Sequence, residues 1–429
     1  MSRSWADIAE ERTLRIGERI GANASWLLAG RAVSQLLTIL VTILIARRMG
    51  DAVLGQYALI SSVIFLFNGI STLGTDVLLV RESAARRDFS YFVPALVVQL
   101  AISAVAILLI YAITPLWAQQ ADVIAPMRIY SLSLIPLAFF TVFGASLRGK
   151  EEMGAYSILT VLLLLLQVVG ILLLPRKLTG IGELMAILLF AHVAVAGVAA
   201  ILASAKLPDL KTIWRTNREP IGNVLRGGAA IAAFGILATA YQRLSLYFVG
   251  SMLDAASTGW FAAALRVVEA PKFVHVAVLS ALLPTMSQAH VSKEGEQYAR
   301  VFGLSFGGLA AFSAAFAVVV FLFAAPLTWF LFGAEFAATA EVLKLVVWTL
   351  IPFAISQTLA TRLLAANQER KIIASLLAAI ALLSFLCWLW IPGRGSLGAA
   401  WAMLLSEIVL AATLFAFWTR KTWRARKAW

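Results

Sequence analysis

The sequence predicts an all-α polytopic membrane protein of about twelve transmembrane helices, arranged as two lobes of six. Hydrophobic residues make up 61% of the 429 residues and charged residues only 13%, far from the roughly half-apolar, quarter-charged balance of soluble domains. The mean hydropathy is +0.89. Apolar runs of about 20 residues recur along the whole chain, and each is long enough to cross the hydrocarbon layer as a helix. These runs do not alternate with period two, which excludes a β-barrel.

The apolar runs place the helices in order. The first six are expected near 24–46, 53–80, 91–113, 126–147, 156–175 and 181–203, and the second six near 223–249, 258–286, 301–324, 339–364, 371–391 and 396–418. The first run is full length and follows a charged segment, so we expect a retained anchor and not a cleaved signal peptide. The expected units are an N-terminal segment 1–23, an N-lobe 24–205, an interlobe linker 206–222, a C-lobe 223–418 and a basic tail 419–429.

The distribution of basic residues predicts the orientation. If the N-terminus is cytoplasmic, most Lys and Arg residues fall in inner segments, and the outer loops hold only Arg47, Arg48, Arg176, Lys177 and Arg394. This asymmetry satisfies the positive-inside rule and places both termini in the cytoplasm. The net charge of +13 is then explained by anionic inner-leaflet lipids, without a nucleic-acid partner.

The two halves of the chain resemble each other. Segment 51–58 returns as 254–262, and segment 134–138 returns as 350–354 in the same order and with similar spacing. Because each half holds an even number of spans, the repeats predict parallel lobes related by an axis along the membrane normal. The prolines Pro136 and Pro352 occupy matching helices, and Pro271 lies inside another. Each is a hinge candidate, with a static kink as the alternative.

Four cations lie inside predicted helices and away from the helix ends, where such residues normally face a cavity or a partner. Arg31 lies in the inner third of the first helix, and Arg243 lies in the outer third of the seventh. Arg266 and Lys272 lie near the middle of the eighth. Staggered in depth, they predict a cationic path for an anionic headgroup, since guanidinium groups hold phosphate oxygens bidentately. The alternative is internal ion pairing, because Glu269 is three residues from both Arg266 and Lys272.

The buried carboxylates offer a second function. Asp76, Glu269 and Glu407 could couple transport to a proton or sodium gradient, or could be packed or paired. No cofactor or metal is predicted, because segment 144–151 lacks the Ser or Thr of a phosphate-binding loop. No connection exceeds roughly 20 residues, which leaves no room for a soluble catalytic domain. The sequence therefore predicts a transporter and not an enzyme.

Several segments then resemble a known family. In the first half these are Ser25 to Arg31, Ile45 to Gly50, Leu54 to Ala58, Thr72 to Asp76 and Arg81-Glu82. In the second half they are Gly259 to Arg266, Leu283-Pro284 and Leu331 to Phe336. Together they resemble the polysaccharide-transporter (O-antigen flippase, Wzx-type) family of the multidrug/oligosaccharidyl-lipid/polysaccharide (MOP) exporter superfamily. The motifs are degenerate and mostly structural, so the resemblance carries no catalytic set.

The resemblance implies a flippase with a two-lobed bundle like those of multidrug and toxic-compound extruders (MATE-like). It would move an undecaprenyl-diphosphate-linked oligosaccharide, such as an O-antigen or exopolysaccharide repeat unit, across a bacterial or archaeal cytoplasmic membrane by alternating access. Other glycan-assembly membrane proteins are candidate partners, and a cationic cavity is expected in the family. Twelve spans fit this branch better than the lipid II flippase branch, which usually has fourteen. The sugars have no readable signature.

Two other functions remain open from the sequence. A drug or metabolite exporter of the same fold would have a central cleft dominated by Asp and Glu. A membrane glycan polymerase or ligase would normally need a large periplasmic loop, and the short outer connections argue against it.

Overall fold

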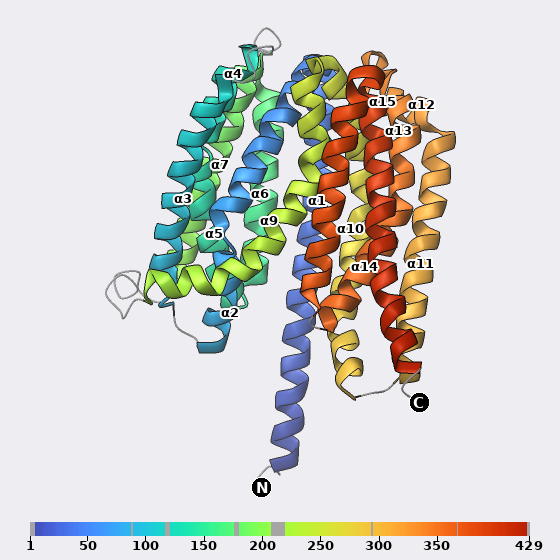
Figure 1. Cartoon of the computed structure of the whole chain (residues 1–429). Helices are drawn as coiled ribbons and strands as arrows, with labels where there is room; N and C mark the ends of the chain where they lie inside the picture. The colour runs from blue at the N-terminus through green and yellow to red at the C-terminus, as the bar shows by residue number, and fades with distance from the viewer. Residues whose placement is uncertain are drawn as a thin grey trace.

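The computed structural model describes residues 5–86, 89–115, 121–175, 180–206, 219–292, 295–366 and 368–426, which are mostly helical and contain no β-strand. Two upright bundles stand side by side, with α1 and α9 between them (Figure 1). Both chain termini lie at the same end of the molecule (Figure 1). We call this the terminal end, and we call the opposite end, where the chain turns at Gly50 and Gly395, the distal end.

The N-lobe contains the helices of the first half of the chain. They are α1 (Trp5–Thr72), α2 (Thr75–Arg86), α3 (Phe92–Ile113), α4 (Ala121–Ser131), α5 (Leu134–Gly149), α6 (Met153–Leu173) and α7 (Ile181–Lys206). Helix α1 is interrupted at Gly50, whose φ of 86° lies in the left-handed region that glycine adopts without a steric penalty. This interruption lets one long helix supply two consecutive crossings.

The C-lobe follows the same plan. Its helices are α9 (Ile221–Met252), α10 (Ala255–Ser292), α11 (Gly295–Leu322), α12 (Ala324–Phe332), α13 (Thr339–Val346), α14 (Leu350–Ala365) and α15 (Glu369–Arg426). Helix α15 is interrupted at Gly395, which has a φ of 55°. Both lobes therefore use a glycine to turn a long helix at the distal end, although Gly50 follows the first crossing and Gly395 precedes the last.

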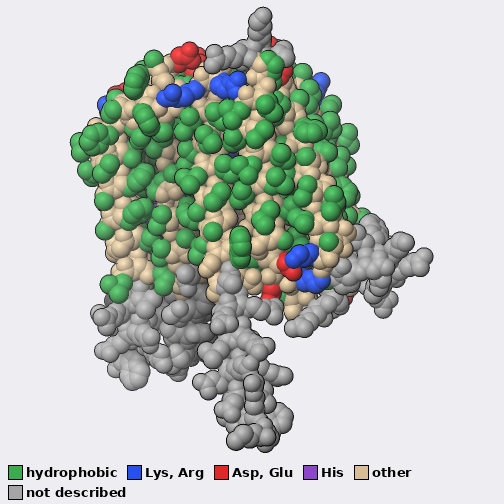
Figure 2. Space-filling view, turned by 180° about the vertical axis from the view of Figure 1, so that it is seen from behind, with side chains coloured by type: hydrophobic (Ala, Val, Ile, Leu, Met, Phe, Trp, Pro, Cys, Tyr) green, Lys and Arg blue, Asp and Glu red, His purple; other side chains and the backbone are tan. Residues whose placement is uncertain are grey.

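The lengths and apolarity of these helices fit a membrane protein. Eight helical stretches are long and apolar enough to cross a membrane, and two of them, Ser25–Thr72 and Glu369–Thr419, have 48 and 51 residues. At about 1.5 Å per residue, each of these two can cross the bilayer twice. With α9 and α10, the described residues provide twelve crossings. The back face of the molecule carries a continuous apolar surface, with basic side chains near its upper edge (Figure 2).

The predicted fold class is confirmed, and the structure refines several helix bounds. The span expected at 53–80 is broken, because Leu73 and Gly74 both have positive φ and separate α1 from α2. The span expected at 126–147 breaks at residues 132–133, and the span at 339–364 contains a 3₁₀ turn at Val347–Thr349. Most of the linker predicted at 206–222 lies outside the described residues.

The two hinge candidates of the internal repeat occupy equivalent places. Pro136 is the third residue of α5, and Pro352 is the third residue of α14. Each therefore follows a break in its span and lies in a first helical turn, where the missing proline N–H costs no helical hydrogen bond. Pro271 is buried within α10. Whether these prolines act as hinges stays a prediction.

Three large apolar cores and a small fourth one, made of Leu279, Leu309 and Ala354 in the C-lobe, are buried among the described residues. One core lies within the C-lobe, and one lies in the N-lobe and includes Val224 from the start of α9. The third combines Ile45 and Leu54 of α1 with Phe332 and Phe336 of the second half. The lobes therefore share a buried core at the distal end.

Candidate functional site

Three charged side chains meet between α9 and α10. Arg243 Nη1 of α9 lies 3.0 Å from Glu269 Oε1, and Arg266 Nη1 lies 2.8 Å from Glu269 Oε2. Arg266 and Glu269 are one helical turn apart on α10, so their ion pair is the alternative that the sequence left open. Arg243 comes from the neighbouring helix, so both carboxylate oxygens of Glu269 are engaged. We call these three residues the charge triad.

The charge triad lies at the boundary between the lobes. The guanidinium carbon of Arg243 is 5.1 Å from the centre of the Phe65 ring, which belongs to α1 of the N-lobe. Such a cation–π contact is favourable, and it places the triad against the opposite lobe. Next to the triad, α1 and α9 lie close together. A Cβ atom added at Gly69 of α1 would lie 3.7 Å from the Thr239 side chain of α9. The triad therefore faces α1 and not an outer surface of the C-lobe.

The charge triad lies deep in the bundle but is not sealed from solvent. Arg243 and Arg266 lie about 15 Å along α9 and α10 from the distal ends of these helices, which is near mid-bilayer. The side chains of Arg243, Glu269 and Arg266 are 23%, 24% and 18% exposed. The Nε of Arg243 has no hydrogen-bond partner among the described residues. Because this atom is also buried, it is not exposed to an acceptor from solvent in this conformation.

Lys272 and Glu407 lie in an adjoining part of the C-lobe. The Lys272 Nζ is 4.6 Å from the centre of the Phe353 ring on α14. Lys272 and Glu407 line one cavity together with Tyr241 of α9 and Gln357 of α14. Lys272 is therefore placed next to the charge triad, being three residues from Glu269, and also beside a second carboxylate.

Arg31 is separate from this group. It is exposed on α1, and it makes no hydrogen bond or ion pair with any other residue that the structure describes. It lies about 28 Å along α1 from Gly50, nearer the terminal end than the charge triad. The structure therefore brings together three of the four predicted cations, and it leaves Arg31 at a different depth.

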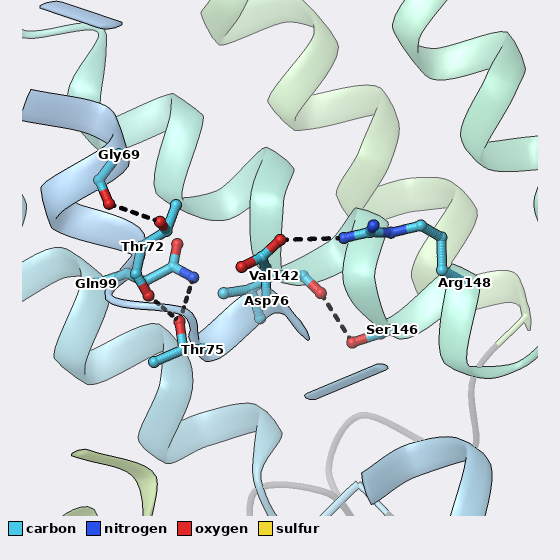
Figure 3. Close-up of polar contacts among 8 residues, drawn as sticks. All are labelled: Gly69, Thr72, Thr75, Asp76, Gln99, Val142, Ser146 and Arg148. Carbon is cyan, nitrogen blue, oxygen red and sulfur yellow. Dashed lines mark hydrogen bonds and ion pairs between the residues drawn. The ribbon is translucent and has the colours of Figure 1, made fainter. Parts of the chain in front are cut away.

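Asp76 is part of a polar cluster in the N-lobe. Its carboxylate points toward Arg148 of α5, at 3.5 Å from the Nη2 atom (Figure 3). The Arg148 guanidinium also lies 5.0 Å from the centre of the Tyr156 ring. Beside it, the buried amide of Gln99 donates to the Thr75 hydroxyl at 2.7 Å (Figure 3). Asp76 is therefore a paired carboxylate, one of the alternatives that the sequence left open.

The distal end is closed by close contact between α1 and α10. The indole N–H of Trp260 donates to Asp51 Oδ2 at 2.9 Å and to the Glu335 carbonyl at 3.2 Å. Arg47 donates to the Leu331 carbonyl at 2.9 Å and also to the Phe330 carbonyl. These contacts join the N-lobe to the C-lobe across the distal end.

Sequence reasoning missed the roles of three arginines. Arg47 and Arg48 were assigned to a loop, yet both bind carbonyl groups at helix ends. Arg148 was assigned to a cytoplasmic segment, yet it pairs with Asp76. The sequence signal for Arg47 and Arg48 is their position near a helix end, where arginines often bind free carbonyl groups. No sequence pattern identifies which distant helix end is reached.

The described residues offer no evident metal site. No group of three or more His, Cys, Asp or Glu side chains among them could hold a metal ion. The single cysteine, Cys387, is buried in the C-lobe core.

Comparisons with known proteins give a family and a fold. The family model described as "Polysaccharide biosynthesis protein" matches residues 20–290. A comparison with curated proteins finds no match. The similar solved structures below are distant in sequence, so they speak for the fold.

Three of these structures illustrate the likeness. An inward-facing multidrug resistance MATE family transporter of the MOP superfamily has a TM-score of 0.77 and 16% identity, covering 92% of this chain and 96% of that chain. The lipid II flippase MurJ in an inward closed conformation has a TM-score of 0.75 and 14% identity, covering 92% and 87%. A MOP superfamily transporter from Pyrococcus furiosus, described as having a binding pocket of reversed polarity, has a TM-score of 0.69 and 14% identity, covering 95% and 96%.

Proposed function

Because this chain belongs to the polysaccharide biosynthesis protein family, we propose that it is a flippase for a lipid-linked oligosaccharide. The substrate would be an undecaprenyl-diphosphate-linked glycan, such as an O-antigen or exopolysaccharide repeat unit. The two lobes would carry it between leaflets of the cytoplasmic membrane by alternating access, with no chemical change to the substrate. The resemblance predicted from the sequence, to polysaccharide transporters of the MOP superfamily, is confirmed.

The charge triad is the observation that carries this proposal. Arg243 and Arg266 share one carboxylate, and Lys272 lies one helical turn further along α10. The group is therefore net positive, and its Arg243 contacts Phe65 of the opposite lobe near mid-bilayer. Arginine suits a diphosphate because its planar guanidinium donates two parallel hydrogen bonds and stays charged.

The path would use cations at different depths. Arg31 lies nearer the terminal end than the charge triad, and it has no described partner. With both termini in the cytoplasm, as the basic residues predict, Arg31 would meet the diphosphate first and the triad would receive it next. The polyprenyl tail would stay in lipid, which costs no desolvation of polar groups. Anionic inner-leaflet lipids would contact the basic terminal end.

An exporter of cationic drugs is the nearest rival, and it would need an acidic site. The described charges between the lobes instead favour an anionic substrate. The Pyrococcus furiosus relative is described as differing in function by the polarity of its binding pocket, which supports the use of charge to distinguish substrates on this fold. No observation favours a glycan polymerase.

A proton or sodium gradient would supply the driving force. Glu407 is the strongest candidate for coupling, because it is 5% exposed and its Oε2 has no described partner. Glu269 is held by two arginines and Asp76 by Arg148, so both are poorer candidates. Other membrane proteins of glycan assembly would supply the substrate and take up the product.

Charge reversal tests this function. Arg266→Glu and Lys272→Glu should each abolish export of surface glycan in cells that depend on this chain, while the protein remains inserted in the membrane. Arg370→Glu on the exposed start of α15 is the matched control, and it should export normally. Full export by both Arg266→Glu and Lys272→Glu would reject the proposed cationic path. Proteoliposomes with imposed proton or sodium gradients would then identify the coupling ion.

A further inference from the structure

The C-lobe encloses a small polar cavity between α9, α10, α14 and α15. Its lining includes Tyr241, Ser245, Lys272, Gln357 and Glu407, and its volume is ≈60 Å³. A water molecule needs about 10–15 Å³ of such space, so the cavity has room for a few waters. It is too small for a diphosphate-linked sugar. The cavity therefore cannot hold the substrate itself, although Lys272 of the proposed cationic path lines it.

Glu407 supplies the negative charge in this cavity. Its side chain is almost fully buried, and its Oε2 has no hydrogen-bond partner among the described residues. Of the neighbouring hydroxyls, Tyr241 donates to Ser406 at 3.2 Å and also interacts with the Glu407 carboxylate, and Ser406 donates to the Ala379 carbonyl at 2.8 Å. An unpartnered buried carboxylate oxygen is costly. It therefore points to a species that binds there and is small enough for the cavity.

Lys272 supplies the positive charge. Its ammonium group lies over the Phe353 ring and lines the same cavity, yet it makes no ion pair with Glu407 within the described chain. Among the lining residues, Lys272 and Glu407 are the charged groups and Tyr241 is the other titratable one. From the remaining helices, α14 contributes Gln357, and the first half of α15 contributes leucines. The two opposite charges thus share one enclosed space without direct contact.

This arrangement disfavours a metal ion. Hard cations are bound by several oxygen ligands, usually including more than one charged or carbonyl group. Here one carboxylate is available, and an ammonium group already occupies the cavity and would repel a second cation. A proton needs neither several ligands nor space.

We propose that the C-lobe cavity is a proton site and not a sodium site, in which Lys272 provides the positive charge that a bound Na⁺ would otherwise bring to Glu407. A proton from water would form an O–H bond with Glu407 Oε2, which becomes a neutral donor and later returns the proton to water. This inference rests on the proposed transport function and names its coupling ion.

The position of Lys272 gives the proton site a route to the charge triad. Lys272 lies one helical turn from Glu269 on α10, where side chains at this spacing are neighbours. When Glu407 is charged, Lys272 is drawn toward the cavity. When Glu407 is protonated, Lys272 is free to turn toward Glu269, which would weaken the hold of Glu269 on Arg243 and Arg266. Protonation would thus make both arginines more available to a diphosphate.

Purified full-length protein allows a test that does not require transport. The wild type should have the same Tm in NaCl as in choline chloride at equal ionic strength. Its infrared spectrum should contain the carbonyl band of a protonated carboxylic acid at low pH, and Glu407→Gln should lose this band. Lys272→Met should gain a stabilisation by Na⁺ that choline does not give, and the double variant Lys272→Met/Glu407→Gln should lose it. Glu341→Gln, which removes a carboxylate that is 65% exposed, is the matched control and should behave as the wild type.

Stabilisation of the wild type by Na⁺ that disappears in Glu407→Gln would overturn the proposal, since it would place the metal ion in this cavity. A low-pH infrared band that persists unchanged in Glu407→Gln would also overturn it. The comparison of salts in the wild type remains decisive even if Lys272→Met does not fold. Because these measurements need no glycan substrate, they stand even if the proposed flippase activity fails.

Discussion

Gly55 and Gly259 occupy matching positions in the two halves of the chain, and each packs against the backbone of the other's helix. A Cβ atom on Gly55 would lie 1.8 Å from the Ala255 carbonyl oxygen, and one on Gly259 would lie 2.1 Å from the Asp51 carbonyl oxygen. Neither neighbour is the end of a flexible side chain that could move away. The absence of a side chain at both positions is therefore what lets α1 and α10 close the distal end.

Replacing either glycine should open the distal end. Gly259→Ala would overpack the contact at a cost of about 1–3 kcal/mol, which shifts a two-state equilibrium by roughly 5- to 150-fold toward the distally open state. Spin labels at Gly180 and Leu397, on the distal parts of the two lobes, should report a longer distance. Gly307→Ala is the control, because a Cβ atom added there would meet nothing within 4 Å. An unchanged distance in Gly55→Ala and Gly259→Ala would mean that these glycines do not keep the distal end closed.

The sequence predicted this contact only in part. The repeat of segment 51–58 in segment 254–262 made the two turns equivalent, and the structure confirms that both begin a helix at the distal end. Their contact with each other depends on how two distant helices are placed side by side. Hydrophobic periodicity gives the face of one helix, but it does not give the partner of that face.

The charge triad, too, can be predicted from the sequence only in part. The spacing of Arg266 and Glu269 offered their pairing as an alternative to an open cationic path, and the structure places the two side chains 2.8 Å apart. Lys272 is also three residues from Glu269, but the second ion-pair partner of Glu269 is Arg243 from α9. Pairs within one helix follow from its geometry. Pairs between helices require the relative height and rotation of both helices, which no local pattern contains.

Glu269 should compete with a diphosphate for the two arginines. Glu269→Gln removes the charge that holds Arg243 and Arg266, so their donors become more available to an added anion. We expect Glu269→Gln to bind inorganic pyrophosphate on the order of tenfold more tightly than the wild type, which corresponds to about 1.4 kcal/mol. The rise in Tm on titration with pyrophosphate measures this difference. Glu341→Gln, whose carboxylate pairs with Lys344 on the same helix, is the control, and an equal response in all three proteins would show that Glu269 does not compete.

The pair of Asp76 and Arg148 should contribute modestly to stability. Both side chains are about a quarter exposed and lie 3.5 Å apart, so a double-mutant cycle with alanine should give a coupling of about 1 kcal/mol or less. Arg148→Ala should cost more than Asp76→Ala, because it also removes the contact with Tyr156, worth about 0.5–1 kcal/mol. Thermal unfolding of the four proteins measures both quantities. If Asp76→Asn instead abolishes transport without lowering the Tm, Asp76 has a role in ion coupling and not only in stability.

Arg47 and Arg48 are adjacent in sequence but should have different effects when removed. Arg48 donates to the carbonyls of Ile171, Leu172 and Leu174 at the end of α6, at 2.7–3.0 Å, so its contacts stay within the N-lobe. Arg47 donates to the end of α12 in the C-lobe. Loss of Arg48 removes partners from carbonyls at a helix end, and Arg48→Ala should lower the Tm while leaving the distance between labels at Gly180 and Leu397 unchanged.

Arg47→Ala removes a contact between the lobes that exists only while the distal end is closed. It should therefore lengthen the distance between the same two labels, with a smaller change in Tm than Arg48→Ala gives. Each arginine serves as the control for the other, because the two changes remove the same charge at the same depth. If both variants lengthened the distance equally, the effect would come from the lost charge and not from the specific carbonyl contacts of Arg47.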